Sequence, residues 1–117
     1  MIDSSRHFLP VEHIKKTIDS LMFNKMNVLH WHVIDQDSFP LFIPALPELS
    51  YYGHISGVYS MNDVKDITTY AKSRGVRIVV EIDTPAHTHS WGRNHQFQDT
   101  VVRCNSVYTG QFDPTLN

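Results

Sequence analysis

Residues 28–35 read VLHWHVID, a short apolar run that closes with an acidic side chain. Apolar runs of this length that are rich in β-branched and aromatic residues indicate a strand. Alternate residues of a strand point to opposite faces, so Leu29, Trp31 and Val33 share one face and the two histidines share the other. We therefore expect a strand over residues 28–34, with Asp35 at its carboxyl end.

Helix-like stretches stand on both sides of this strand. Pro10 suits the first turn of a helix, and apolar residues then recur at helical spacing as far as Met22. A second helix is predicted to begin at Ser60, which forms a capping-box pattern with Asp63, and to end at Gly75. Residues 76–82 form another apolar run, which predicts a strand that is covered on both faces.

A long connection, residues 36–59, separates the first of these strands from the second helix. It carries three prolines and several aromatic residues. Loops of that length are usually functional or disordered, and the aromatic content favours an ordered loop. From residue 84 to residue 117 the sequence shows no periodicity that predicts a further element.

The order of these elements predicts an α/β fold with a parallel sheet. Residues 1–3 are interpreted as the end of a strand, so the order is strand end, helix, strand, helix, strand and long loop. A (β/α)8 barrel takes roughly 250 residues. The 117 residues are therefore expected to form one incomplete (β/α)8 TIM barrel, 1–117, with roughly its first three strands and two helices. An open three-stranded sheet is the alternative, and it would leave apolar surfaces uncovered.

Composition narrows the possible partners. Hydrophobic residues make up 41% of the chain and charged residues 19%, an ordinary globular balance, and the net charge of −2 offers no basic surface for nucleic acid. No apolar run approaches the ~18–20 residues of a membrane span, and no signal peptide is expected in this segment. The single cysteine, Cys104, is too few for a cysteine-based metal motif, and its own partner stays open.

Polar clusters fall where each of the three strands ends, at residues 3–7, 30–35 and 81–88. In parallel α/β sheets the working residues gather at the carboxyl ends of the strands. We therefore expect Arg6, Asp35 and His87 to meet at one face and to form part of an active site.

The histidines also allow a different interpretation. His30 and His32 lie two apart on one strand, a spacing that suits zinc, and His87 and His89 repeat it in a loop. Barrel metal hydrolases carry such a pair at the very end of the first strand, whereas this pair lies in the middle of the second. A hydrogen-bonded barrel interior explains the strand pair more simply, and His89 is expected to be exposed. A metal-dependent hydrolase remains the alternative.

Long motifs run through the chain in a fixed order: DSSRHFLP at 3–10, FNKMNVLHWHVID at 23–35, SFP at 38–40, PEL at 47–49 and EIDTPAHTHSWG at 81–92. Together they resemble the β-N-acetylhexosaminidases of glycoside hydrolase family 20, over essentially the whole chain. The resemblance implies a (β/α)8 barrel that removes terminal N-acetylglucosamine or N-acetylgalactosamine from N-acetylhexosamine-terminated glycans or glycolipids, without a metal or other cofactor. It also implies a lysosomal, vacuolar or secreted location and a dimer in the full-length protein.

The family's mechanism needs a residue pair that this chain does not contain. The acetamido oxygen of the substrate attacks the anomeric carbon in a substrate-assisted, retaining reaction. An aspartate orients that group, and the adjacent glutamate protonates the leaving oxygen. After His87 the acidic residues are Asp99 and Asp113, and neither has an acidic neighbour. We therefore expect the chain to be inactive on its own, and a non-catalytic sugar-binding module is a further alternative.

The resemblance assigns roles to three residues that are present. Arg6 corresponds to the sugar-binding arginine, whose planar fork suits two neighbouring hydroxyls. Asp35 and His87 correspond to a supporting pair behind the missing acid, in which the carboxylate fixes the imidazole tautomer. From chemistry alone, a structural ion pair is equally open for Arg6, and ordinary structural roles are favoured for Asp35 and His87. Ala86 stands where the family usually has glycine, so the loop backbone is expected to differ there.

Two nearby residues have less specific expected roles. Asp83 ends a strand and is expected to hold the turn that follows it. Trp91 suits either stacking on a sugar ring or packing against the protein, because an aromatic face serves both purposes.

Overall fold

The computed structural model describes residues 1–94 and 97. Three parallel strands form one sheet in the order β1-β2-β3. The strands are β1 (Ile2–Asp3), β2 (Val28–Ile34) and β3 (Arg77–Ile82), and the helices are α1 (Val11–Phe23), α2 (Pro47–Gly53), α3 (Met61–Ser73) and the short 3₁₀ helix η1 (Trp91–Arg93). The expected strand–helix alternation and the strand over residues 28–34 are confirmed.

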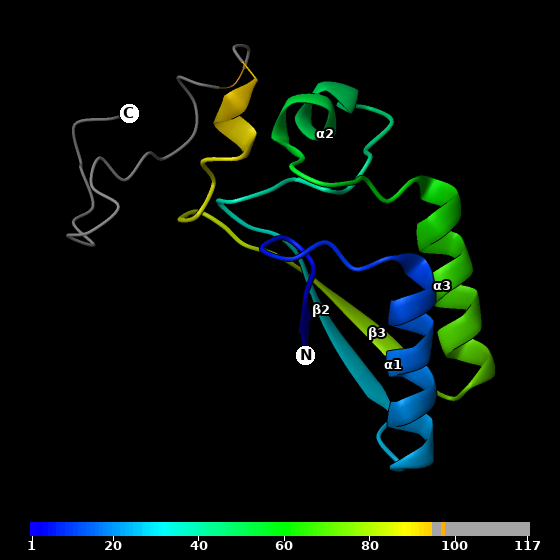
Figure 1. Ribbon diagram of the computed structural model, residues 1–117. Coiled ribbons are helices and arrows are strands. Elements are labelled where there is room, and N and C mark those ends of the chain that lie inside the picture. Colours follow the sequence, from blue (N-terminus) through cyan, green and yellow to red (C-terminus); the bar gives the residue numbers. More distant parts are fainter. Residues whose placement is uncertain (95–96, 98–117) are drawn as a thin grey trace.

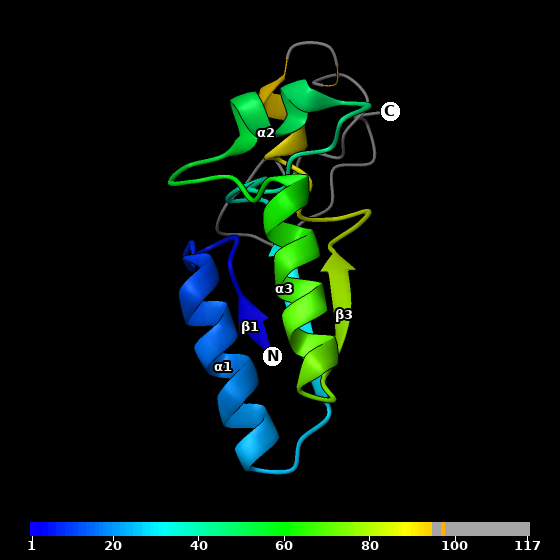
Figure 2. The same ribbon diagram turned by 90° about the vertical axis from the view of Figure 1, so that its right-hand side faces the viewer.

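Helices α1 and α3 lie side by side against one face of the sheet, and α2 and η1 lie beyond the carboxyl ends of the strands (Figures 1 and 2). Leu29, Trp31 and Val33 point from β2 into the core, and each has at most 1% of its surface exposed. Ile14 of α1 and Ile67 of α3 are fully buried in the same cluster. Burying a side chain of this size contributes about 1.5–3 kcal/mol, so this layer fixes the helices on the sheet.

The local signals for α3 are present in the structure. The Asp63 amide donates to Ser60 Oγ at 3.1 Å and the Ser60 amide donates to Asp63 Oδ2 at 2.8 Å, which completes the expected capping box. Gly75 follows the helix with φ +69°, a left-handed conformation that glycine adopts without steric cost. The sequence therefore fixes both ends of this helix.

The connection between β2 and α3 is ordered and contains the helix α2, which the sequence did not predict. Pro47 opens this seven-residue helix, and so short a segment shows too little periodicity to stand out. The Phe39 amide donates to the Gly53 carbonyl at 3.0 Å. A Cβ on Gly53 would lie 2.6 Å from that of Phe39, so the close approach requires glycine. The expectation of two helices is thus corrected to three α-helices among the described residues.

The prediction that both faces of β3 are covered is wrong for this chain. Val79, Val80 and Ile82 are 42%, 46% and 43% exposed. Within the described part of the chain, β3 pairs with β2 along one edge and with no strand along the other. The apolar sequence of β3 is thus typical of a strand that needs further neighbouring elements to cover it. None of the described helices is long and apolar enough to cross a membrane.

We expect the isolated chain to associate, because β3 presents an unpaired, apolar edge. Size-exclusion chromatography with light scattering should show oligomers of residues 1–117. Val80→Lys on this edge should reduce them, since charged side chains discourage edge pairing. Tyr51→Lys is the control, because Tyr51 is 72% exposed on α2. A monomer of the unmodified chain with a sharp cooperative thermal transition would contradict this expectation.

Candidate active site

The three strands end at one edge of the sheet, below α2 and η1 in Figure 1, and polar residues lie at each strand end. Asp35 lies at the centre and is fully buried. Its Oδ2 accepts a hydrogen bond from His32 Nε2 at 2.7 Å and forms an ion pair with Arg6 Nη2, also at 2.7 Å. Its Oδ1 accepts from the Gln36 amide at 2.5 Å. Both carboxylate oxygens of Asp35 are therefore held, by groups from β2, from the loop that follows it and from the loop after β1.

Asp35 and His32 meet because β2 contains one residue more than β3 over the same length. Residues three apart on a regular strand point to opposite faces. Here His32 pairs with Glu81 and Ile34 pairs with Ile82, so the register shifts between the two positions of β2. Such an irregularity re-aims the side chains that follow it. It brings the Asp35 carboxylate onto the side of the sheet that carries His32.

Arg6 joins the first strand end to the second. Besides Asp35, its guanidinium contacts Asp3 at 2.7 Å and Asp37 at 3.5 Å. The hydrogen bond that Arg6 donates to Asp3 is the main reason why the pKa of Arg6 is raised, and the charges of Asp35 and Asp37 add to it. The side chain is still 46% exposed. The expected meeting of Arg6 and Asp35 is confirmed as an ion pair, and it leaves part of the guanidinium accessible.

One row across the sheet carries three ionisable residues. Asp3 pairs in register with His32, and His32 pairs with Glu81. His32 Nδ1 lies 2.7 Å from Glu81 Oε1, and the other oxygen of Glu81 bonds His30. His30 and His32 thus line a hydrogen-bonded sheet face, which is the simpler of the two interpretations of this histidine pair.

Contacts of this row, which consists of Asp3, His32 and Glu81, shift the pKa values of these three residues. Burial disfavours the charged form of His32, but hydrogen bonds to Glu81 and Asp35 outweigh burial and raise the pKa of His32. The hydrogen bond from His32 lowers the pKa of Glu81, against the opposing effect of burial. For Asp3, burial raises the pKa, but hydrogen bonds from Arg6 outweigh it and the net pKa is lowered. All three shifts favour the ionised state of the row.

His87 does not contact Asp35, and the expected pairing of these two residues is not formed. His87 Nδ1 instead lies 2.8 Å from Asp83 Oδ2, so Asp83 does hold the turn that follows β3. His87 has φ +57°, a conformation in which non-glycine residues are uncommon, and this backbone folds the ring back toward Asp83. Ala86 has no positive φ, so alanine fits its position. Both oxygens of Asp35 are already engaged, which leaves Asp83 as the partner of His87.

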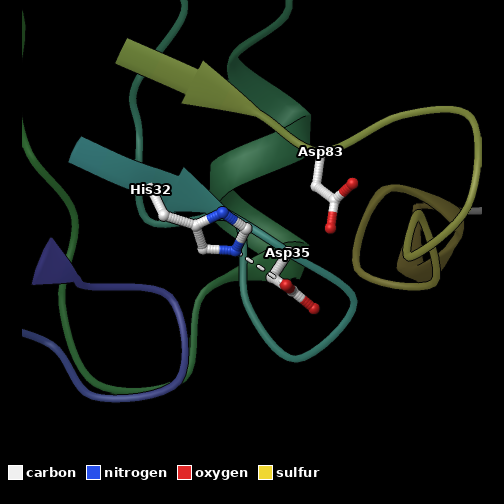
Figure 3. A group of neighbouring side chains, drawn as sticks. All are labelled: His32, Asp35 and Asp83. Atoms are coloured by element: carbon white, nitrogen blue, oxygen red, sulfur yellow. Dashed lines mark hydrogen bonds and ion pairs between the residues drawn. The ribbon is translucent and has the colours of Figure 1, made fainter. Parts of the chain in front are cut away.

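His32, Asp35 and Asp83 form a compact group in which one ligand-type atom from each residue lies within 4.8 Å of the others (Figure 3). That spacing resembles a metal site, but the donors are already used. His32 faces a carboxylate at each ring nitrogen, and the Oδ2 atom of Asp35 is ion-paired with Arg6. A metal cation would have to displace a guanidinium and break these bonds. The geometry therefore fits an ion-pair network better than a metal centre.

The remaining candidate residues lie at the margin of this group. His89 is exposed, as expected. Trp91 packs edge-on against Phe39 with ring centroids 5.4 Å apart, which supports the packing role. Sequence reasoning missed Glu81 and Asp3 as members of the site. Their only signal was their place at the ends of strands, because the register that aligns them with His32 is not visible in a sequence.

A parallel α/β sheet whose strand ends carry a buried carboxylate, an arginine and histidines is typical of the active-site end of a (β/α)-barrel enzyme. Residues 1–114 match the family described as "Glycosyl hydrolase family 20, catalytic domain". The chain belongs to glycosyl hydrolase family 20.

Known proteins agree with this assignment. The chain is 47% identical over 124 aligned residues to β-hexosaminidase subunit beta of Mus musculus, which covers 100% of this chain and 23% of the relative. It is 46% identical over 96 residues to β-hexosaminidase 3 of Arabidopsis thaliana, covering 81% of this chain and 18% of the relative. The chitobiase of Flavobacterium johnsoniae superposes with a TM-score of 0.80 at 30% identity, covering 98% of this chain and 18% of that chain.

These comparisons confirm the expected fold class, an incomplete (β/α)8 barrel. They also show the extent of the match: the chain spans 23% of the length of the mouse relative. The strands of the described sheet are thus the counterpart of only a part of the catalytic barrel in its relatives.

Proposed function

We propose that residues 1–117 form the amino-terminal part of the catalytic domain of a β-N-acetylhexosaminidase. The enzyme hydrolyses terminal N-acetyl-D-hexosamine residues from glycans or glycolipids by substrate-assisted, retaining catalysis, in a lysosome or vacuole or outside the cell, and as a dimer. The observation that carries the proposal is the Arg6–Asp35 pair at the carboxyl edge of the sheet, in a chain that matches the family's catalytic domain over residues 1–114.

Arg6 is proposed to bind the sugar at the non-reducing end. Three carboxylates fix the orientation of its guanidinium, while 46% of the side chain stays exposed. A planar, oriented guanidinium donates two parallel hydrogen bonds, and neighbouring hydroxyls of a pyranose present two matching acceptors. Such preorganisation favours binding because little side-chain freedom is lost when the sugar arrives.

Asp35 and His87 are proposed to support the catalytic acid, which this chain does not contain. Asp35 is buried and immobilised, as a residue that orients another group must be. His87 is held by Asp83 and keeps 47% of its side chain exposed. Its left-handed backbone is the kind of uncommon conformation that concentrates at functional sites. The exposed ring is available to face a residue supplied by a later strand.

The chain alone should not hydrolyse a chromogenic N-acetylglucosaminide, because a positioned acid typically contributes about 10²–10⁴-fold in rate and is absent here. A hybrid in which residues 1–117 replace the matching segment of the mouse subunit, called the completed barrel below, should hydrolyse it. An inactive completed barrel that folds would contradict the proposed function. Amino-sugar binding without turnover would favour the sugar-binding module, and stoichiometric zinc would favour the metal-dependent hydrolase.

In the completed barrel, Arg6→Lys should raise KM about tenfold or more. Lysine keeps the charge but loses the two-pronged geometry, and one lost charge-assisted hydrogen bond is worth roughly 1.5–3 kcal/mol. Arg74→Lys is the matched control, because Arg74 pairs with Asp19 between α1 and α3, away from the site. Steady-state kinetics measures both variants. Equal KM values for Arg6→Lys and the unmodified protein would assign Arg6 a structural role only.

Two double-mutant cycles identify the carboxylate that acts with His87. If Asp35 and His87 support the same acid, Asp35→Asn with His87→Phe should cost little more in kcat than the worse single change. The cycle of Asp83→Asn with His87→Phe is the comparison, because Asp83 is the residue that contacts His87 in this structure. Additive losses in the first cycle and strong coupling in the second would replace Asp35 by Asp83 as the functional partner.

A further inference from the structure

Six ionisable side chains form one uninterrupted series of hydrogen bonds and ion pairs across the sheet. In order they are His30, Glu81, His32, Asp35, Arg6 and Asp3. The series begins in the middle of the sheet and ends at its carboxyl edge. Arg6 and Asp35 already have proposed roles, whereas His32 and Glu81 have none.

We propose that His32 is a positioning residue. It holds Asp35, and through Asp35 it holds the guanidinium of Arg6 in the orientation that binds the sugar. Glu81 in turn fixes the orientation of the His32 ring. The proposal rests on the proposed function, in which Arg6 binds the substrate. His32 itself lies beneath the edge with only 6% of its side chain exposed, so it acts through its neighbours.

The geometry requires His32 to donate at both ring nitrogens. Nε2 lies 2.7 Å from Asp35 Oδ2 and Nδ1 lies 2.7 Å from Glu81 Oε1. An ionised carboxylate only accepts hydrogen bonds, so both nitrogens need a proton, and the ring is then a cation. A neutral ring would turn a lone pair toward one carboxylate. Either the hydrogen bond to Asp35 or the hydrogen bond to Glu81 would then be lost.

Loss of that proton unbalances the charges around Arg6. The ionisable groups that face this site are Asp3 at the end of β1 and Arg6 after it, His30, Asp35 and Asp37 from β2 and its loop, and Glu81 and Asp83 from β3 and its end. With a neutral His32, Asp35 Oδ2 keeps Arg6 as its one cationic donor. We expect Arg6 to be drawn further onto Asp35, which withdraws the guanidinium from the sugar.

The direction of the pH dependence follows from the same contacts. The pKa of His32 is raised, because hydrogen bonds to Glu81 and Asp35 outweigh burial. The positioned state is therefore fully present below the ordinary histidine value of about 6.5 and is lost as pH rises through the raised value. On the acidic side, the lowered pKa of Glu81 keeps its carboxylate ionised.

The test measures KM and kcat of the completed barrel across the neutral and alkaline range. The unmodified protein should show a KM that rises at alkaline pH. Glu81→Gln keeps an acceptor for His32 but removes the charge, so the rise should move to lower pH by about one unit. His32→Gln keeps a donor but cannot titrate, so its KM should no longer respond to this pH range. His54→Gln should follow the unmodified profile, because among the described residues the His54 ring bonds only the Ser50 carbonyl.

A substrate-free measurement keeps the inference separate from the proposed function. Nuclear magnetic resonance of the same proteins follows the His32 ring and the Arg6 Nε resonance, and both should change in step, at a lower pH in Glu81→Gln. An Arg6 resonance that does not change over the pH range in which His32 titrates would overturn the inference. A pH profile of KM that is the same in Glu81→Gln and in the unmodified protein would also overturn it. Should His32→Gln fail to fold, Glu81→Gln decides, because its side chain is 38% exposed. If the His32 and Arg6 resonances change together in a completed barrel that does not hydrolyse the substrate, the inference is supported and only the proposed function is contradicted.

Discussion

The structure of this site depends on one buried carboxylate. Asp35 has no exposed surface, and an ionised group in that position is tolerated only when it is paired and hydrogen-bonded. Donors from three directions meet this requirement: His32 on the same strand, Arg6 after the neighbouring strand and the adjacent backbone amide. Removing one partner of a buried ion pair typically costs about 3–5 kcal/mol. The positions of the other residues are therefore tied to that of Asp35.

The parallel sheet makes this pairing possible. Parallel strands end at the same edge of the sheet, so the residues that follow β1, β2 and β3 are neighbours, although 77 positions separate Arg6 from Asp83 in the sequence. The core between β2 and the helices α1 and α3 holds the strands in register, since Leu29, Trp31 and Val33 are locked among helical side chains. Packing on one face of the sheet thus sets the electrostatics on the other.

The same network bears on the choice between the metal-dependent hydrolase and the proposed sugar-binding site. A metal-dependent hydrolase needs histidine nitrogens and carboxylate oxygens that are available to a cation. Here those atoms satisfy one another, and a guanidinium already provides positive charge beside Asp35. An oriented arginine beside a fixed carboxylate suits the recognition of a polar, uncharged ligand such as a sugar. The local geometry therefore fits the proposed sugar-binding role of Arg6 better than it fits a metal centre.

Much of this site could be predicted from the sequence. Strand β2 and the capping box of α3 follow from local chemistry, because side-chain alternation and capping depend on residues only a few positions apart. The meeting of Arg6 and Asp35 follows from the rule that parallel strands place their carboxyl ends together. The short helix α2 has too few residues to show a periodic pattern, and the exposure of β3 depends on neighbours that no local pattern describes.

The sequence by itself determined the three strands, the helices α1 and α3, their order, the family and the edge at which the polar residues gather, since all of these depend on local patterns and motifs. Only the tertiary structure decided which of those residues pair. The extra residue of β2 turns Asp35 toward His32, and the register of β3 places Glu81 beside the same ring. The left-handed backbone at His87 directs that ring to Asp83. Which residues pair across a sheet depends on the register of the strands and on the face toward which each side chain points. A register shift of one residue changes the partners and moves each side chain to the opposite face.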